Sequence, residues 1–91
     1  MTYLLCRNRV ADFERWKAVF APHRWAHMAA GLRLIHLWRE AGEAENVFFL
    51  FEVASVEQAR EFMGDPEAAK AAAAAGVMDG EYHFMEEAEG Y

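Results

Sequence analysis

Imidazole side chains gather in one stretch of this chain. His23 and His27 lie four residues apart, and His36 follows nine residues later. Residues at i and i+4 share one face of a helix, so His23 and His27 can present two ring nitrogens to one ligand, with His36 as a conceivable third group. Histidine also acts as a general base near neutral pH, and His23 is the candidate for that role.

The same pair is a weak signal for a metal. No Asp or Glu stands at ligand spacing beside His23 and His27, and metal sites usually need three or four protein ligands. We therefore expect neither a metal site nor a bound cofactor. The alternative interpretation is that one histidine is hydrogen-bonded within the core or at its edge, and that the other reaches solvent.

These histidines belong to a predicted helix from about Phe13 to Ala30, which Asp12 can cap. At 100° per residue, a buried stripe covers about one third of its circumference. The stripe consists of Phe13, Trp16, Val19, Phe20, His23, His27 and Ala30. Pro22 removes one backbone hydrogen bond, so the helix bends there or a second segment begins. Trp25 is exposed if the helix is straight and buried if Pro22 resets the phase.

Strand patterns surround this helix. The segment Val47 to Val53 is apolar on nearly both faces, which is typical of a central strand, and Thr2 to Arg9 and Tyr82 to Glu86 also alternate. In Leu32 to Arg39, simple alternation places Leu32, Leu34, His36 and Trp38 on one face. The polar segment Glu40 to Glu45 is the expected hairpin loop.

Two further helices are predicted before the last strand. Ser55 begins the first, with Gln58 completing a capping box and Gly64 ending it. Asp65 and Pro66 then start another helix, which contains five consecutive alanines and ends at Gly76. Alanine favours a helix but offers little side chain for packing, so this helix must lie close to its neighbours or remain exposed.

The order of elements predicts an α+β, ferredoxin-like βαββαβ fold, a single domain over residues 1–91. Right-handed crossovers place the helices on one face of a four-stranded antiparallel sheet. Phe48, Leu50 and either Leu4 or Leu5 would then stand on an uncovered face, more apolar than soluble monomers usually expose. We therefore predict a homodimer in which two sheets pack face to face.

Composition limits the other partners. The net charge of -6 argues against nucleic acid, and no apolar run approaches the length of a membrane span, so we expect neither partner and a cytoplasmic location. Cys6 is expected to be a small buried hydrophobe. Arg7 is expected to pair with Glu52 or to face a substrate carboxylate, and His83 is expected at the surface.

Several segments carry a resemblance to a known family. They are Val10 to Phe20 with its Asp-Phe-x-x-Trp-Lys pattern, His23, Ala30 and Gly31, Asn46 to Glu52, Asp65 to Glu67, and Ala75 to Val77. Nearly the whole chain resembles the dimeric α/β barrel superfamily. That superfamily includes antibiotic biosynthesis monooxygenase-like, muconolactone isomerase-like and heme-degrading proteins, so the resemblance implies fold better than function.

The resemblance implies an asparagine and a tryptophan beside an electron-rich substrate for cofactor-free oxygenation. Asn8, with Trp16 or Trp38, could take these parts, although a turn-capping asparagine and packed tryptophans are the commoner arrangement. For heme breakdown, His23 or His27 would be the axial ligand.

Two functions follow. One is an enzyme acting on a small aromatic or polyketide-like molecule in a pocket between helices and sheet. His23, Asn8 and Trp16 would be its catalytic residues, and Phe20, His27, His36 and Trp38 would bind the substrate. The other is a non-catalytic binding protein or structural dimer.

Overall fold

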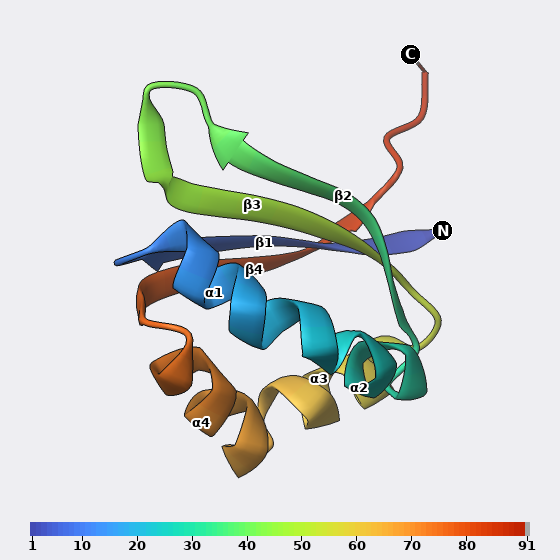
Figure 1. Ribbon diagram of the computed structural model, residues 1–91. Helices are drawn as coiled ribbons and strands as arrows, with labels where there is room; N and C mark the ends of the chain where they lie inside the picture. The colour runs from blue at the N-terminus through green and yellow to red at the C-terminus, as the bar shows by residue number, and fades with distance from the viewer. Residues whose placement is uncertain (91) are drawn as a thin grey trace.

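One antiparallel sheet of four strands organises the computed structural model, which describes residues 1–90. The elements are β1 (Thr2–Val10), α1 (Phe13–Phe20), η1 (Ala21–His23), α2 (Arg24–Ala29), β2 (Leu32–Glu40), β3 (Glu43–Val53), α3 (Val56–Met63), α4 (Pro66–Ala74) and β4 (Val77–Glu86). The strand order is β2-β3-β1-β4, and the helices cover one face (Figure 1). The predicted ferredoxin-like α+β fold is confirmed; Tyr91, which the predicted domain also includes, lies outside the described residues.

The predicted long helix is divided at Pro22. α1 ends at Phe20, a 3-10 turn spans Ala21–His23, and α2 begins at Arg24. A proline removes a backbone donor and restricts the chain, which explains the break. Trp25 remains 72% exposed, so the break does not bring it into the core. No helix within residues 1–90 has the length and apolar character needed to cross a membrane.

Helix caps follow the sequence, with one correction. Asp12 Oδ1 accepts from the backbone N–H of Glu14 at 3.0 Å, and Ser55 Oγ accepts from that of Gln58 at 3.2 Å. The predicted return contact of the capping box, from the Gln58 side chain to the backbone N–H of Ser55, was wrong. The Gln58 Nε2 group donates to the carbonyl of Ala29 at 3.1 Å, which ties α3 to the end of α2.

β3 and β4 begin well before their predicted starts at Val47 and Tyr82, and β1 and β2 each end one residue later than predicted. β3 starts at Glu43, so the hairpin turn narrows to Ala41 and Gly42, where Gly42 has a φ of +82°. β4 starts at Val77 because its polar residues pair with the arginines of β1. The Arg9 Nε group donates to Asp79 Oδ2 at 2.8 Å, for example. Apolar alternation alone could not reveal these polar ladder positions.

A register shift in β2 overturns one predicted face. Leu34 pairs with Phe51, but the next pairs are His36 with Leu50 and Trp38 with Phe48, with the shift between Leu34 and His36. Directly paired residues share a face, so the irregularity leaves Leu34 on the helix side and turns the two later residues to the other side. The prediction that His36 and Trp38 share a face with Leu32 and Leu34 was wrong.

The core lies between the sheet and the helices. Alternate residues of β3, Val47, Phe49, Phe51 and Val53, are buried there, as the strand pattern predicted. Trp16 is 1% exposed, stacks on Phe20 with ring centroids 4.4 Å apart, and packs against Phe49.

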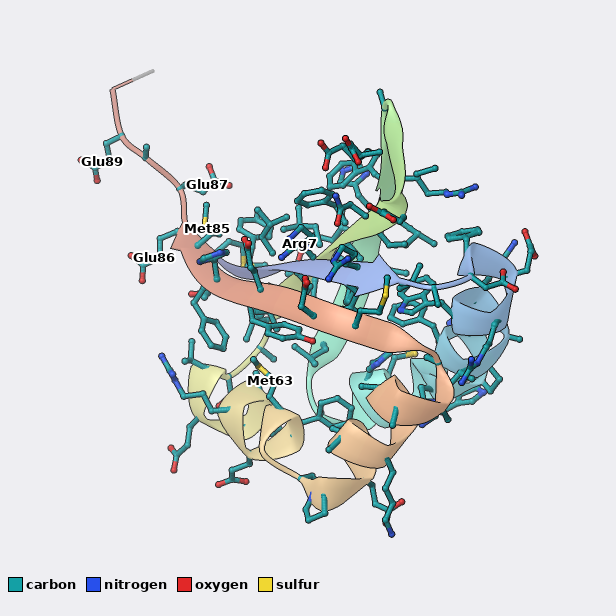
Figure 2. All side chains as sticks on the ribbon, turned by 90° about the vertical axis from the view of Figure 1, so that its left-hand side faces the viewer. Arg7, Met63, Met85, Glu86, Glu87 and Glu89 are labelled. Atoms are coloured by element: carbon teal, nitrogen blue, oxygen red, sulfur yellow. The ribbon has the colours of Figure 1, made fainter. Side chains whose placement is uncertain are left out.

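The opposite face of the sheet has no helical cover within residues 1–90. Figure 2 shows Arg7 and Met85 on this side and Met63 on the other side, between sheet and helices. Leu5, Phe48 and Leu50 share the uncovered face with Arg7, because they are paired neighbours across β1 and β3.

The ion pairs of this face differ from the prediction for Arg7. Its guanidinium lies 3.0 Å from both Asp79 Oδ1 and Glu81 Oε1, whereas Glu52 lies 2.7 Å from Arg33. The strand register explains these ion-pair partners. Arg7 stands opposite Glu81 of β4, and Glu52 stands opposite Arg33 of β2.

Candidate functional site

A cavity of about 320 Å³ lies between the helices and the covered face of the sheet. Leu4, Cys6 and Phe49 contribute to the sheet side, and α4 contributes chiefly alanine methyl groups, including Ala68 and Ala72. The α4 helix is held in place from α1, since the Arg15 Nε group donates to the Ala74 carbonyl at 2.9 Å. Short side chains on a fixed helix leave space unfilled, which accounts for the cavity.

A hydrogen-bonded trio stands in the cavity wall. Asn8, 7% exposed, has one end of its amide 3.1 Å from Trp16 Nε1 and the other 3.1 Å from the Tyr82 hydroxyl. An indole N–H can only donate, so the orientation that satisfies every group turns Asn8 Oδ1 toward Trp16. The Asn8 Nδ2 group then donates to Tyr82 Oη and, at 3.2 Å, to the Arg7 carbonyl.

This orientation of Asn8 makes Tyr82 a hydrogen-bond donor toward the cavity. Its oxygen accepts from Asn8, so its own O–H remains available to donate to a molecule in the cavity that it lines. A phenol is already protonated near neutral pH, and burial raises the pKa of Tyr82 further. A hydroxyl oxygen that accepts a hydrogen bond becomes a stronger donor, so the contact with Asn8 strengthens the Tyr82 O–H as a donor.

Gly80 makes room for the trio. It pairs with Asn8 across β1 and β4, and a Cβ at this position would lie 3.0 Å from both Tyr82 Oη and the end of the Asn8 amide that faces Tyr82. A glycine within a strand often marks such a close approach. The sequence prediction placed Gly80 before the last strand and omitted Tyr82 from the site. A glycine two residues before a tyrosine in an alternating segment was the available signal.

His23 supplies an acceptor. Its Nδ1 lies 2.8 Å from the carbonyl oxygen of Val19, one turn earlier. A carbonyl can only accept, so Nδ1 carries the proton, and Nε2 of the neutral ring keeps a lone pair. Because His23 lines the cavity, this lone pair is a candidate general base.

His27 has a different environment. Its ring lies 5.1, 5.0 and 5.5 Å from the rings of Phe20, Phe51 and Phe62, respectively. Burial, with a smaller contribution from His23, lowers the pKa of His27 to about 4. The ring is therefore neutral at pH 7 and a weaker base than an ordinary histidine.

The thiol of Cys6 is 1% exposed, and burial raises its pKa to about 12. It therefore stays a protonated, apolar part of the cavity, in accordance with the prediction of a buried hydrophobe. Within residues 1–90, no three or more His, Cys, Asp or Glu side chains form a cluster that could hold a metal ion.

The structure brings five of the seven predicted site residues to the cavity: Asn8, Trp16, Phe20, His23 and His27. His36 and Trp38 lie on the opposite face of the sheet, where their rings stack 4.8 Å apart. The β2 irregularity separates them from the cavity, so their predicted place beside Trp16 was wrong.

The element order, the strand order and the helix-covered cavity define a ferredoxin-like α+β domain. No family model and no curated protein matches the sequence. Solved structures do match it. A candidate antibiotic biosynthesis monooxygenase from Bordetella bronchiseptica has a TM-score of 0.79 at 13% identity, covering 96% of each chain.

Two further structures share the fold. A candidate antibiotic biosynthesis monooxygenase from Caulobacter crescentus has a TM-score of 0.73 at 18% identity, covering 97% of this chain and 90% of its own. An uncharacterized NIPSNAP domain protein from Burkholderia xenovorans has a TM-score of 0.71 at 14% identity, covering 98% of this chain and 96% of its own. The three structures therefore share the ferredoxin-like fold that the predicted resemblance implies.

Proposed function

We propose that the cavity binds a small hydroxylated aromatic or polyketide-like molecule and that the protein is a cofactor-independent monooxygenase, cyclase or isomerase. The observation that carries this proposal is one apolar cavity lined by a hydrogen-bond donor, Tyr82 O–H, and an acceptor, His23 Nε2. Aromatic walls with a few placed polar groups are typical of small-molecule sites.

The proposed catalysis begins with proton transfer. His23 Nε2 accepts the proton of a ring hydroxyl, and Tyr82 donates to a second oxygen of the ligand, which stabilises the resulting anion. The anion places negative charge on a ring carbon that still bears hydrogen. A cyclase or isomerase would use the same base and the same donor, and would return the proton to a different atom.

For the oxygenase, the substrate anion supplies the electrons. That ring carbon forms a C–O bond with O₂, and the peroxide takes back the proton held by His23. Loss of water from this hydroperoxide, with the hydrogen of the same carbon, leaves a carbonyl group. One oxygen atom of O₂ enters the product and the other leaves as water, so no external reductant is needed. Trp16 and Asn8 act through Tyr82 by fixing its donor, and are positioning residues.

Binding and turnover can be tested separately. Without O₂, 1,3-dihydroxynaphthalene should bind to the wild type, and binding should weaken about fivefold to tenfold in Tyr82→Phe, which loses the donor to the second oxygen of the ligand. 1,3-Dihydroxynaphthalene should consume one O₂ per ring oxidised, and His23→Gln should abolish this uptake while it preserves binding. Binding without turnover or rearrangement would refute the enzyme and favour the non-catalytic binding protein. Equal binding by wild type and Tyr82→Phe would refute the assigned donor.

The sheet-to-sheet homodimer belongs to the same proposal, with a cytoplasmic location. Leu5, Phe48 and Leu50 form a half-buried apolar strip on the uncovered face, and Met85 of β4 is 44% exposed there. Trp38, stacked on His36, extends the strip across β2 and is 46% exposed. A second copy would bury this strip, so we propose an interface role for His36 and Trp38 in place of substrate binding.

A further inference from the structure

A second hollow of about 310 Å³ lies between α2 and the edge strand β2. We call it the outer hollow; the residues that it does not share with the cavity are Ala21, Arg24, Met28, Arg33 and Leu34. Phe20, His27 and Leu32 line both spaces, so these three side chains form the partition between them.

The partition contains one polar ring, and that ring is weakly held. The His23 ring is anchored by the 2.8 Å contact of its Nδ1 with the Val19 carbonyl, whereas the His27 ring makes no hydrogen bond to another group of residues 1–90. His27 contacts its neighbours through aromatic faces, which restrain a ring less directionally than a hydrogen bond does. A rotation of His27 would therefore connect the two spaces without breaking a hydrogen bond.

The two arginines that line the outer hollow differ in whether a carboxylate neutralises them. Arg33 is already paired with Glu52 at 2.7 Å, but no carboxylate in the described part of the chain lies within ion-pair distance of Arg24. The Arg24 guanidinium instead lies 5.9 Å from the centre of the Trp25 ring. In a chain of net charge -6, this leaves one cation beside an apolar surface that includes Met28 and Leu34, 50% and 42% exposed.

From this arrangement we infer that the ligand is an aromatic carboxylate that spans both spaces. The apolar ring system of the ligand lies in the cavity, the aliphatic linker of the ligand passes His27, and the carboxylate of the ligand pairs with Arg24 in the outer hollow. Guanidinium forms two parallel hydrogen bonds to a carboxylate, and the adjoining apolar side chains exclude water from one side of the pair. This inference rests on the proposed function and assigns its substrate class.

A matched pair of probes tests the carboxylate. 4-(2-Naphthyl)butanoate and its primary amide have the same apolar body and differ in charge. The wild type should bind the carboxylate about tenfold more tightly, the lower end of what a charge-assisted hydrogen bond provides at a partly exposed site. Arg24→Gln should remove this preference and leave affinity for the amide unchanged. Arg24→Lys should retain part of it, since it keeps the charge without the planar fork.

Two control variants distinguish a failure of the Arg24 subsite from a failure of ligand binding in the cavity. Lys17→Gln removes an exposed cation that lines neither space, and the preference should persist. Ala72→Leu fills the cavity, and both probes should lose at least tenfold in affinity. Equal binding of both probes by the wild type, abolished by Ala72→Leu, would overturn the Arg24 subsite and leave the proposed cavity intact. Binding of neither probe, or binding indifferent to Ala72→Leu, would overturn both.

Discussion

Ala72→Leu should stabilise the protein while it abolishes binding, because Ala72 lines an unfilled cavity. Leucine adds three carbon atoms at this site, and burying them contributes up to about 2 kcal/mol. Ordering the longer side chain costs about 0.5 to 1 kcal/mol. The net gain is therefore about 1 kcal/mol, or a rise of about 4 to 8 °C in Tm for a domain of this size. The cavity of about 320 Å³ accommodates the added atoms.

Urea unfolding followed by tryptophan fluorescence measures the stability, and titration with 2-naphthol measures the binding. Ala73→Leu is the matched control. Ala73 belongs to the same helix but is exposed and does not line the cavity, so this variant should change stability by less than about 0.5 kcal/mol and preserve binding. Destabilisation of Ala72→Leu by more than about 1 kcal/mol would show that the interior beside Ala72 is already packed and that no cavity is there to fill.

Three other predictions follow from the site and the sheet. Gly80→Ala should cost about 1 to 3 kcal/mol in urea unfolding and weaken 2-naphthol binding, because its Cβ would crowd Asn8 and Tyr82; unchanged values for both would exclude the crowding. His27 has a folded pKa below its unfolded value, so the unfolded state binds more protons between about pH 4 and 6.5; stability is retained above this window and lost as the pH falls through it. The loss should be about 1 to 2 kcal/mol after allowance for the partly exposed ring, and His27→Phe should lose less stability than the wild type over the same range. Leu50→Asp should convert a species of twice 10.4 kDa into a monomer in native mass spectrometry, and a wild-type monomer would contradict the dimer.

The sequence was sufficient for most of the architecture because the hydrophobic periodicity was strong. The stripe from Phe13 to Ala30 and the alternation of Val47 to Val53 required two layers, and Pro22 marked the break between α1 and α2. Strand ends were less predictable. The beginning of β4 depends on pairing between charged residues such as Arg9 and Asp79, and such pairs become visible only when the partner strand is known.

The site was predictable in part for the same reason. Asn8 and Trp16 line the cavity because they lie on a regular strand face and a regular helical face, and His23 lines it from the end of the 3-10 turn Ala21–His23. His36 and Trp38 were misplaced, because the irregularity between Leu34 and His36 reverses the faces of both side chains and leaves no mark in the residue types. Tyr82 was missed because its partner, Asn8, lies 74 residues away along the chain.

If a small aromatic molecule binds in the cavity beside Trp16, the three tryptophans provide separate reporters of its location. Trp16 hydrogen-bonds Asn8 in the cavity wall, Trp25 is exposed on α2, and Trp38 lies on the opposite face of the sheet. A ¹H–¹⁵N correlation spectrum recorded during titration with 2-naphthol resolves their indole N–H signals. We predict that the Trp16 signal shifts saturably while the other two stay in place. A shift confined to Trp38 or Trp25, or no shift at all, would contradict binding in this cavity.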